Sequence, residues 1–391
     1  MRVLMVTRET GDDRRYGLGK SLLPLFEPLQ RLGAEARYFC QDDLPPLALA
    51  QRQRQLERVG RVPWMSGRPT RMMLAQAWLE RLQVGQAGAM LAVREGFTHV
   101  HAHDPWLACG VGLGLRRAGN HTIRWGLTQH GFGSYAQATH EDGLIQGPRT
   151  QTWMRRIERW ITARAGWVMA PTALSLAQLA RDLDLPSRPA HWHHVPHARP
   201  ALTPAPPQVK AAARAALGWS APEQIVLGVG RLVPLKGFDR LIRACAAQRN
   251  PHLRLLLVGG GDAGALKALA AELGFAGQLR IEASDDMTPY YAAADVYVSA
   301  SSTEAFGMAN LEALCAGLPS LCTAVGGVPE VVGEGGWLVP NDVESLSRSL
   351  TTLLTDEACR TRWAQRAAAR AAQWPDTRTI AGQYVAIYQA A

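Results

Sequence analysis

The sequence predicts an α/β protein built from two doubly wound, Rossmann-like domains. One reason is length, because 391 residues exceed what a single ordinary core accommodates. A second is that short apolar segments alternate with amphipathic ones along the whole chain, as in parallel sheets flanked by helices. A third is a proline-rich break near the middle. Apolar segments such as Leu253–Val258 are hydrophobic at almost every position, which is typical of parallel strands covered on both faces.

The break lies at Arg199–Pro207, where three of the last four residues are prolines. Proline fixes φ and lacks a backbone N–H, so this composition favours extended chain and disfavours regular structure. We therefore expect a first domain over residues 1–200 and a second domain that begins at residue 201.

The expected elements follow from the periodicity of apolar residues on each side of the break. In the first half we expect strands at Val3–Thr7, Ala36–Cys40, Thr98–Ala102, Thr122–Thr128 and Trp167–Ala170. In the second half we expect strands at Ile225–Val229, Leu253–Val258, Leu279–Glu282, Val296–Ser299, Ser320–Thr323 and Gly336–Val339. Helices are expected between many of them, for instance at Leu18–Leu32, Asp239–Ala247 and Met308–Cys315.

The positive charge of the chain is concentrated in its first half. The net charge is +9. Residues 1–200 contain 26 Lys and Arg against 16 Asp and Glu, whereas residues 201–391 contain 16 against 17. This asymmetry predicts an anionic partner for the first half: phosphate, lipid headgroups or nucleic acid.

Cysteine usage and hydropathy predict a cytoplasmic protein. The six cysteines are scattered without a CxxC pair or a zinc-type spacing, which suits a reducing compartment. No apolar stretch reaches the roughly 18 to 20 residues of a membrane span. The short apolar run in Met1–Thr7 predicts a buried first strand rather than a signal peptide.

Two carboxylates stand out in the segment Ser301–Ala313. Glu304 lies in a small polar loop after an expected strand, where open α/β sheets bind ligands. A helix is expected to begin at about Gly307 and to carry Glu312. The first N–H groups of a helix bind phosphate, and here they belong to Phe306, Gly307 and Met308. This combination predicts one carboxylate on sugar hydroxyls and one on a ribose. The alternative is a helix-capping Glu304 and a solvated Glu312.

Two cations occupy the loop in Gly228–Phe238. Arg231 and Lys236 follow an expected strand and precede a helix that opens at Gly237. A guanidinium fork and an ammonium at this position suit a diphosphate and would stabilise its departing charge without a metal. The alternative is a pair of ordinary surface cations.

Taken in order, these motifs resemble the retaining GT-B glycosyltransferases of family four, which include glycogen and sucrose synthases and mannosyltransferases. Glu304 and Glu312, eight apart, match the family's E-x7-E motif. Residues 230–237 match its diphosphate loop. Ala293–Val296 resembles the strand before the E-x7-E motif, and Val325–Glu330 resembles the donor-side glycine loop.

The resemblance implies a GT-B fold, with two Rossmann-like domains facing across a cleft. It implies that residues 1–200 bind the acceptor, that residues 201–376 bind the nucleotide-sugar donor, and that a final helix in 377–391 returns toward the first domain. It further implies retaining transfer of a hexose-type sugar from a nucleoside-diphosphate sugar to a hydroxyl of a glycan or lipid-linked glycan. No metal and no cofactor beyond that co-substrate are expected.

The resemblance also implies roles for individual residues. Arg231 and Lys236 would bind the donor phosphates, Glu304 the sugar hydroxyls and Glu312 the ribose. His130 would contact the transferred sugar. The donor-binding positions that it further implies are Gly17, Gly19, Gly230, Ser284, Phe306, Gly307 and Met308.

The glycines of the first half lie in the segment Gly17-Leu18-Gly19-Lys20-Ser21, which follows the first strand and leads into a helix. The segment is not a P-loop, because Arg14 occupies the place of the required first glycine. The family has a glycine loop here that faces the donor phosphate.

Histidines end two expected strands of the first half. His101 lies at the end of one expected strand, with His103 and Asp104 directly after it, and His130 follows the next strand. By the resemblance, such histidines face the cleft, and we assign His103 and Asp104 to the acceptor region. A metal site is an alternative, but it would need a further ligand that the sequence does not supply nearby. Packed or capped histidines are another alternative.

Arginine and tryptophan recur together in two segments of the first half. In Gln51–Leu82 they are Arg52, Arg54, Arg58, Arg61, Arg68, Arg71, Arg81, Trp64 and Trp78. In the second segment they are Trp153, Arg155, Arg156, Arg159, Trp160, Arg164 and Trp167. This composition suits peripheral contact with an anionic membrane. The alternative is a solvated helix face over an apolar stripe. Nucleic acid is not expected, because no binding module is present.

Three competing functions remain open. The run Gly259–Gly264 after an expected strand fits G-x-G-x-x-G, with Glu282 about twenty residues on, which is compatible with an NAD(P)-dependent oxidoreductase. Nucleotide-sugar epimerases share the two-domain architecture. A non-catalytic binding protein would have lost residues such as Glu304 and Lys236, which are present here.

Overall fold

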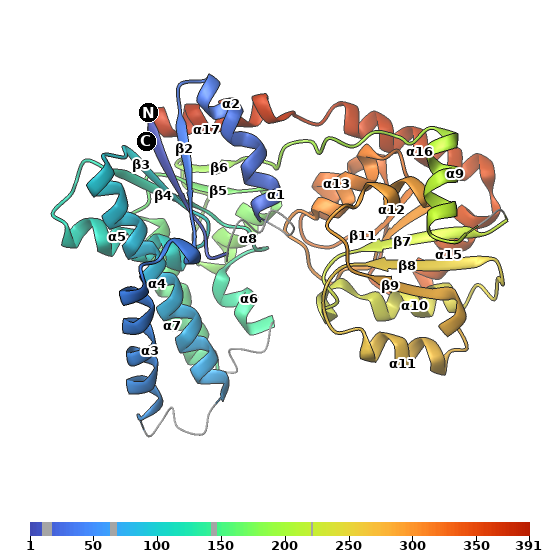
Figure 1. Cartoon of the computed structure of the whole chain (residues 1–391), viewed down its shortest axis with the longest axis horizontal. Coiled ribbons are helices and arrows are strands. Elements are labelled where there is room, and N and C mark those ends of the chain that lie inside the picture. The colour runs from blue at the N-terminus through green and yellow to red at the C-terminus, as the bar shows by residue number, and fades with distance from the viewer. Residues whose placement is uncertain (10–17, 63–68, 142–146, 220–221) are drawn as a thin grey trace. The chain divides into compact units, whose positions relative to one another are not determined.

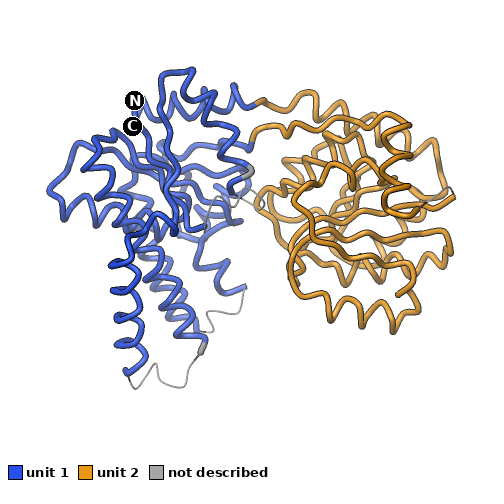
Figure 2. The backbone as a smooth tube through the Cα atoms, viewed as in Figure 1, with its two compact units in different colours: residues 1–197, 377–391 blue, residues 198–376 orange. Residues whose placement is uncertain are grey.

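The fold is described from a computed structural model, which covers residues 1–9, 18–62, 69–141, 147–219 and 222–391. The chain forms two compact units, shown in different colours in Figure 2. Unit 1 consists of residues 1–197 and 377–391, and unit 2 consists of residues 198–376. The chain therefore enters unit 2 at Ala198, next to the expected boundary, and re-enters unit 1 at Thr377.

Unit 1 contains a six-stranded parallel sheet with the order β2-β1-β3-β4-β5-β6 (Figure 1). Its strands are β1 (Arg2–Val6), β2 (Glu35–Phe39), β3 (His99–Ala102), β4 (Arg124–Thr128), β5 (Val168–Ala170) and β6 (Trp192–His194). Strand β1, next to the edge strand β2, pairs on both sides, so that Val3 lies opposite Ala36 on β2 and His99 on β3. Strand β6 was not predicted.

Nine α-helices accompany this sheet within the described residues. They are α1 (Leu18–Leu22), α2 (Phe26–Arg31), α3 (Pro46–Gly60), α4 (Pro69–Glu95), α5 (Pro105–Arg117), α6 (Tyr135–Glu141), α7 (Pro148–Thr162), α8 (Ala173–Asp182) and α17 (Thr377–Ala390). Figure 1 shows α3 and α4 running side by side away from the sheet. Helices α4 and α5 approach closely at Gly85, where a Cβ would lie 2.2 Å from the carbonyl oxygen of Leu107.

The single helix predicted over Leu18–Leu32 is wrong. The segment is divided into α1, a 3-10 turn at Leu23–Leu25 and α2. Pro24 lies in the first residues of the 3-10 turn and Pro28 in the first turn of α2. Proline is tolerated at the start of a helix but removes a hydrogen bond from its interior, so each proline favours a new segment.

Unit 2 contains a second six-stranded parallel sheet, with the order β12-β11-β10-β7-β8-β9. Its strands are β7 (Gln224–Val229), β8 (Leu253–Val258), β9 (Leu279–Glu282), β10 (Val296–Ser299), β11 (Ser320–Thr323) and β12 (Trp337–Val339). Its helices are α9 (Pro207–Ala216), α10 (Phe238–Ala246), α11 (Gly264–Glu272), α12 (Thr288–Ala293), α13 (Met308–Cys315), α14 (Val328–Val332), α15 (Val343–Thr355) and α16 (Glu357–Ala372).

Strand β8 shows why the apolar runs predict a doubly wound sheet. Leu255 and Leu257 belong to one buried hydrophobic cluster, whereas Leu256 and Val258 belong to another. Since successive side chains of a strand point to opposite faces, this sheet has a core on each face. The predicted fold class, two parallel sheets in an α/β chain, is confirmed.

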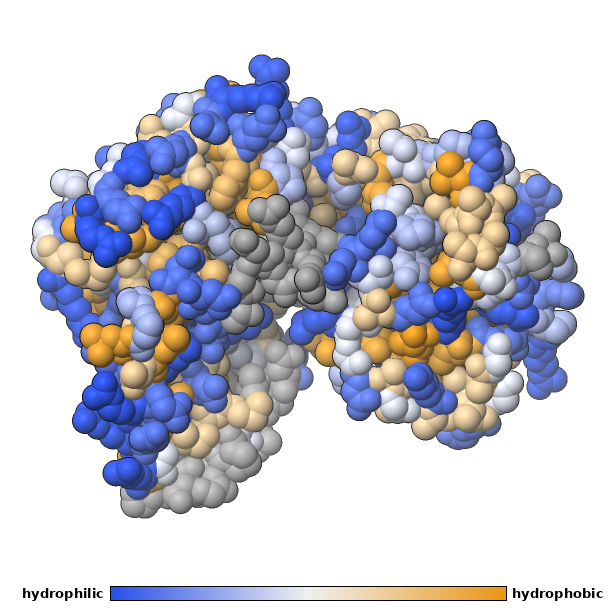
Figure 3. Space-filling model, viewed as in Figure 1, coloured by the Kyte–Doolittle hydropathy of each residue, from blue (hydrophilic) through white to orange (hydrophobic). Residues whose placement is uncertain are grey.

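The surface in the view of Figure 3 is largely hydrophilic on both units, with hydrophobic side chains between the polar ones. Within the described ranges, no helix combines the length and the apolar character required to cross a membrane. The 27-residue α4 carries arginines and glutamates along its length.

Candidate active site

The topology of unit 2 brings two predicted residues to one point. Strands β8 and β9 follow β7 on one side of it, whereas β10 begins on its other side. The direction of strand addition therefore reverses between β7 and β10, and open α/β sheets bind ligands at the carboxyl ends of strands at such a point. Lys236 follows β7 and Glu304 follows β10.

Lys236 and Glu304 form an ion pair. The Lys236 Nζ lies 2.5 Å from Glu304 Oε2, and the side chains are 24% and 19% exposed. The Ser301 hydroxyl donates to the same carboxylate oxygen at 3.5 Å. The predicted phosphate-binding cation and the predicted sugar-binding carboxylate thus contact each other, a pairing that sequence reasoning did not foresee.

Two glycines shape the loop that carries Lys236. Gly230 has a φ of +151°, and a Cβ there would lie 3.1 Å from Lys236 Cε, so the lysine stem crosses over this glycine. Gly237 has a φ of +62°, and its Cβ would lie 2.0 Å from the carbonyl oxygen of Ala300. A larger residue at Gly237 would therefore separate the loops after β7 and β10.

The loop after β11 contacts the backbone of Glu304. The Gly327 N–H donates to the Glu304 carbonyl oxygen at 2.8 Å. Gly326 has a φ of +53°, and a Cβ there would lie 2.1 Å from the same oxygen. This part of the Val325–Glu330 motif therefore fixes the backbone of Glu304.

Helix α13 begins at Met308, with Gly307 as its N-cap in the left-handed conformation at φ +80°. The Phe306 side chain is buried. Glu312 is half-buried on this helix and accepts a hydrogen bond from the Tyr291 hydroxyl at 2.8 Å. Burial, with the nearby Glu312 carboxylate, raises the pKa of Tyr291 well above its usual value, so this phenol remains a donor. Glu312 is therefore not a fully solvated helix residue.

Arg231 and Ser284 lie at the same edge of the sheet. Arg231 is exposed and follows β7, whereas Ser284 is half-buried and follows β9. The Ser284 hydroxyl donates to the backbone oxygen of Asp286 at 2.9 Å. Their assignment to the donor stays a prediction.

The glycine-rich turn after β8 has a packing explanation. A Cβ on Gly259 would lie 1.9 Å from the Gly230 carbonyl oxygen, and the Gly259 N–H donates to the backbone oxygen of Glu282 at 2.8 Å. The Glu282 carboxylate pairs with Arg280. These glycines allow the loops after β7 and β8 to touch, so the G-x-G-x-x-G pattern does not require a dinucleotide.

In unit 1 the strand order reverses between β1 and β3, and His103 directly follows β3. His103 Nδ1 lies 3.1 Å from Nε2 of His130, which follows β4. The His130 ring stacks on His197 with centroids 5.9 Å apart. Burial and the neighbouring imidazoles lower the pKa of His103 and of His130 well below the usual value. These histidines are therefore neutral at neutral pH, and one must donate to the other.

His101 lies behind this pair and is fully buried. Its ring nitrogens lie 2.7 Å from the hydroxyl groups of Tyr388 and Thr128, and burial lowers its pKa to about 3. His101 thus ties α17 to the sheet of unit 1. His103 Nε2 is buried and has no hydrogen-bond partner among the described residues.

Asp104 caps the amino end of α5 and forms a buried ion pair with Arg81. One carboxylate oxygen accepts from the N–H groups of Trp106 at 2.7 Å and Leu107 at 3.3 Å. The other lies 3.0 Å from Nε of Arg81, with side chains only 6% and 9% exposed. Both oxygens are thus engaged by protein groups, and the acceptor contact of Asp104 stays a prediction.

Only part of the predicted amino-terminal glycine loop can be described. Gly17 lies outside the described residues, whereas Gly19 is buried in the short helix α1. The Leu18 N–H donates to Glu9 Oε1 at 3.2 Å, and the Tyr38 hydroxyl donates to Glu9 Oε2 at 3.0 Å. Glu9 was not singled out in the sequence.

Sequence reasoning also missed a buried carboxyl group that binds the backbone of the segment after His130. Glu158 on α7 is 1% exposed and accepts from the N–H groups of Tyr135 at 2.9 Å and Ala136 at 3.3 Å. Burial raises its pKa to about 8. Met154, Glu158 and Ile161 share the buried side of α7, so a glutamate on an apolar stripe was the available signal.

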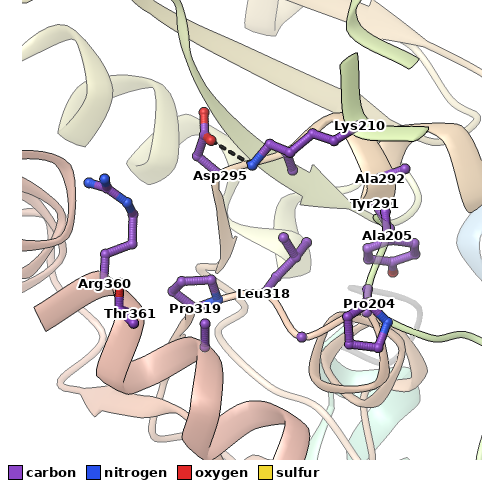
Figure 4. A pocket seen from close by; sticks show the side chains of 14 residues that line it. Pro204, Ala205, Lys210, Tyr291, Ala292, Asp295, Leu318, Pro319, Arg360 and Thr361 are labelled. Carbon is purple, nitrogen blue, oxygen red and sulfur yellow. Dashed lines mark hydrogen bonds and ion pairs between the residues drawn. The ribbon is translucent and has the colours of Figure 1, made fainter. Parts of the chain in front are cut away.

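A separate cavity of about 240 Å³ in unit 2 lies away from the predicted residues. Asp295, just before β10, lines it together with Lys210, whose Nζ lies 2.8 Å from Asp295 Oδ1 (Figure 4). Leu318 and Pro319, just before β11, also contribute. The cavity therefore lies at the amino ends of β10 and β11, whereas Glu304 follows the carboxyl end of β10.

Two family models match successive parts of the chain. The model of glycosyltransferase family 4 matches residues 16–197, and that of glycosyl transferases group 1 matches residues 209–370. The D-inositol 3-phosphate glycosyltransferase of Corynebacterium urealyticum is 31% identical over 314 residues, which cover 74% of this chain and 70% of the relative. The chain belongs to the family 4 glycosyltransferases.

Other curated relatives are matched over a smaller share of their length. The D-inositol 3-phosphate glycosyltransferase of Mycobacteroides abscessus is 33% identical over 253 residues, which cover 62% of this chain but only 54% of the relative. For that of Saccharomonospora viridis, the matched share of the relative is 60%.

Solved structures show the same GT-B fold. Sucrose-phosphate synthase from Thermosynechococcus elongatus superposes with a TM-score of 0.75 at 22% identity, over 99% of this chain and 98% of that one. Anabaena Alr3699/HepE in complex with UDP-glucose gives 0.74 at 19% identity over 100% of both chains. WaaG, a glycosyltransferase involved in lipopolysaccharide biosynthesis, gives 0.68 at 18% identity over 99% of both.

Proposed function

We propose that this protein transfers a hexose-type sugar, with retention of configuration, from a nucleoside-diphosphate sugar to a hydroxyl of a glycan or lipid-linked glycan. We propose further that it uses no metal or other cofactor, and that it contacts an anionic membrane peripherally. Family membership supports the reaction class. The complex of HepE with UDP-glucose supports a nucleotide-sugar donor.

The observation that carries the proposal is the ion pair of Lys236 and Glu304 at the reversal point of the unit 2 sheet. A diphosphate would attract the ammonium, and sugar hydroxyls would donate to the carboxylate. Donor binding then replaces one internal ion pair by two contacts with one ligand.

The chemistry follows from these groups. As the bond between the sugar and the diphosphate breaks, negative charge develops on the diphosphate. Lys236, Arg231 and the positive end of the α13 dipole would stabilise that charge. Glu304 would hold the sugar, and Glu312, fixed by Tyr291, would accept from the ribose. Attack of the acceptor hydroxyl on the same face gives retention and needs no carboxylate nucleophile.

His130 would contact the transferred sugar from unit 1. Because Nε2 of His130 is engaged by His103, its Nδ1 is the nitrogen left to meet a ligand. Neutral imidazoles suit a hydrogen bond to a sugar hydroxyl better than they suit binding of phosphate.

The test is a donor screen with product analysis. The protein is incubated with nucleoside-diphosphate sugars and glycan or lipid-linked acceptors, with and without a chelator. Products are identified by mass spectrometry, and the anomeric coupling constant in their NMR spectra shows whether the configuration is retained. Lys236→Ala and Glu304→Gln should each lower turnover by about 100-fold or more. Lys210→Ala is the matched control, because it breaks the ion pair with Asp295 at the amino end of β10, away from the proposed site. This variant should retain turnover.

Three results would overturn parts of this proposal. Near-normal turnover of the Lys236 or Glu304 variant would reject the site. Loss of turnover on chelation would reject metal independence. Conversion of the donor to an epimer, or binding of NAD(P) in place of nucleotide sugars, would reject the reaction.

A further inference from the structure

The outward side of α7 carries an unusual set of side chains. Exposed residues recur along the helix and its end at the spacing of one helical face. We call this face the α7 stripe, and it consists of Arg149, Trp153, Arg156, Arg159, Trp160 and Arg164. The opposite side of the helix is buried through Met154, Glu158 and Ile161, so the stripe is held in a fixed orientation.

Trp153 and Trp160 are 48% and 43% exposed, and they are the two exposed tryptophans of the described residues. They lie seven residues apart, which places them on one face two turns apart. Trp153 is supported from below by Trp78 of α4, with ring centroids 5.1 Å apart. Half of each large ring surface nevertheless faces solvent.

The charge of the stripe has one sign. Its four arginines are exposed, whereas Glu158, the only acidic residue of α7, is buried. Arg164 lies over the Trp160 ring, with its guanidinium carbon 4.3 Å from the ring centroid. On α6, which packs beside α7, Glu141 is an exposed carboxylate, and Gln137 donates to it.

We propose that the α7 stripe docks this protein onto a membrane that carries anionic lipid headgroups. Indole rings partition into the interfacial zone of a bilayer, where one edge is apolar and the other is wet. Arginines at the same level pair with lipid phosphates. Isolated arginines would be explained by solubility alone, but alternation with exposed tryptophans matches the interface.

The stripe also has a defined relation to the candidate site. Through Glu158, the inward side of α7 holds the N–H groups of Tyr135 and Ala136, a few residues beyond His130. One rigid helix thus carries the docking residues on one side and supports the loop of a predicted site residue on the other. The inference deepens the membrane contact of the proposed function by naming the surface that makes it, and it does not depend on the proposed sugar transfer.

Flotation with vesicles tests the proposal on the full-length protein. Vesicles of phosphatidylcholine alone are compared with vesicles containing three parts phosphatidylglycerol to seven parts phosphatidylcholine. We expect at least about 10-fold stronger partition onto the anionic vesicles, decreasing with salt. Trp153→Ala/Trp160→Ala and Arg156→Gln/Arg159→Gln should each reduce partition by about 10-fold.

Matched controls separate the stripe from general charge and hydrophobicity. Arg362→Gln/Arg366→Gln removes two exposed arginines from α16, and Met90→Ala removes a 52% exposed apolar side chain from α4. Both should bind like the wild type. Circular dichroism verifies that each variant is folded.

Equal partition onto neutral and anionic vesicles, or no loss in the tryptophan variant, would overturn the proposal. So would stronger retention by single-stranded DNA than by anionic vesicles, which would indicate a nucleic-acid surface. Lipid binding that persists in a protein without sugar transfer would leave this inference intact and reject the proposed sugar transfer instead.

Discussion

Replacement of Glu158 by glutamine should remove a pH-dependent loss of stability from unit 1. Glu158 is almost fully buried, and burial, with the nearby Asp104 and Asp182 carboxylates, outweighs its backbone hydrogen bonds and raises its pKa to about 8 from an ordinary 4.5. Glutamine has nearly the same shape and does not ionise. Its one acceptor oxygen can keep the Tyr135 N–H bond, and the bond from the Ala136 N–H is lost equally at every pH, so it adds no pH trend.

The sign follows from proton binding. Between pH 4.5 and pH 8 the folded protein keeps the Glu158 proton, whereas the unfolded chain has lost it. The free energy of unfolding therefore falls as pH rises through this window. Each pH unit costs about 1.4 kcal/mol, so from pH 5.5 to pH 7.5 the wild type should lose about 3 kcal/mol relative to Glu158→Gln. In a unit of this size, that corresponds to a difference in melting temperature of roughly 5–11 °C.

Tryptophan fluorescence during thermal unfolding is the appropriate measurement, because eight of the 12 tryptophans belong to unit 1. The quantity of interest is the difference between wild type and variant at each pH, in which other titrating groups cancel. Glu141→Gln replaces an exposed carboxylate of the same unit and should show no such trend. A difference for Glu158→Gln that stays constant from pH 5.5 to 7.5 would refute the reasoning.

Three further predictions concern the Lys236–Glu304 ion pair, the Arg81–Asp104 ion pair and the loop that joins β7 to α10. Glu304→Ala frees Lys236 for a diphosphate, so calorimetry should show UDP binding about 5-fold tighter, whereas Lys236→Ala should weaken it; an unchanged affinity in both would contradict the pairing. Gly237→Ala places a Cβ 2.0 Å from a facing carbonyl oxygen at φ +62°, and it should lower the free energy of unfolding of unit 2 by about 1–3 kcal/mol in urea titration. Arg81→Ala leaves Asp104 buried without its cation and should cost about 3–5 kcal/mol in unit 1, a loss that a mild phenotype would disprove.

The strands were predictable where burial on both faces makes them apolar throughout. The ranges of β8, β10 and β11 were predicted to the residue, because these strands are buried almost throughout on both faces. The range of β9 was also predicted to the residue, although this edge strand reads Leu-Arg-Ile-Glu and is half-buried at every position. Strand β6 is short and reads Trp-His-His, with only Trp192 buried. An edge strand of this kind has no periodic signal, so its pairing depends on β5 rather than on its own composition.

The sequence indicated the residues of the candidate site, but it did not indicate the contacts between them. The motifs located Lys236 and Glu304, yet their ion pair depends on β10 being placed beside β7, which no local pattern specifies. Asp104 shows the opposite case. An aspartate directly before Pro105 is a typical N-cap followed by proline at the first helical position, and the structure uses Asp104 in that way.

Solvent exposure distinguishes the Arg81–Asp104 ion pair, which stabilises the fold, from the Lys236–Glu304 ion pair, which belongs to the proposed site. Arg81 and Asp104 are 6% and 9% exposed, whereas Lys236 and Glu304 are 24% and 19% exposed. A pair sealed from water is costly to break, because each partner would be left as an uncompensated charge. A pair that water can reach contributes about 1 kcal/mol or less, so an entering ligand can separate its partners and engage both. Under the proposed function, the accessible pair is therefore the one that a donor would open, and it lies at the reversal point of the sheet, where the fold favours ligand binding.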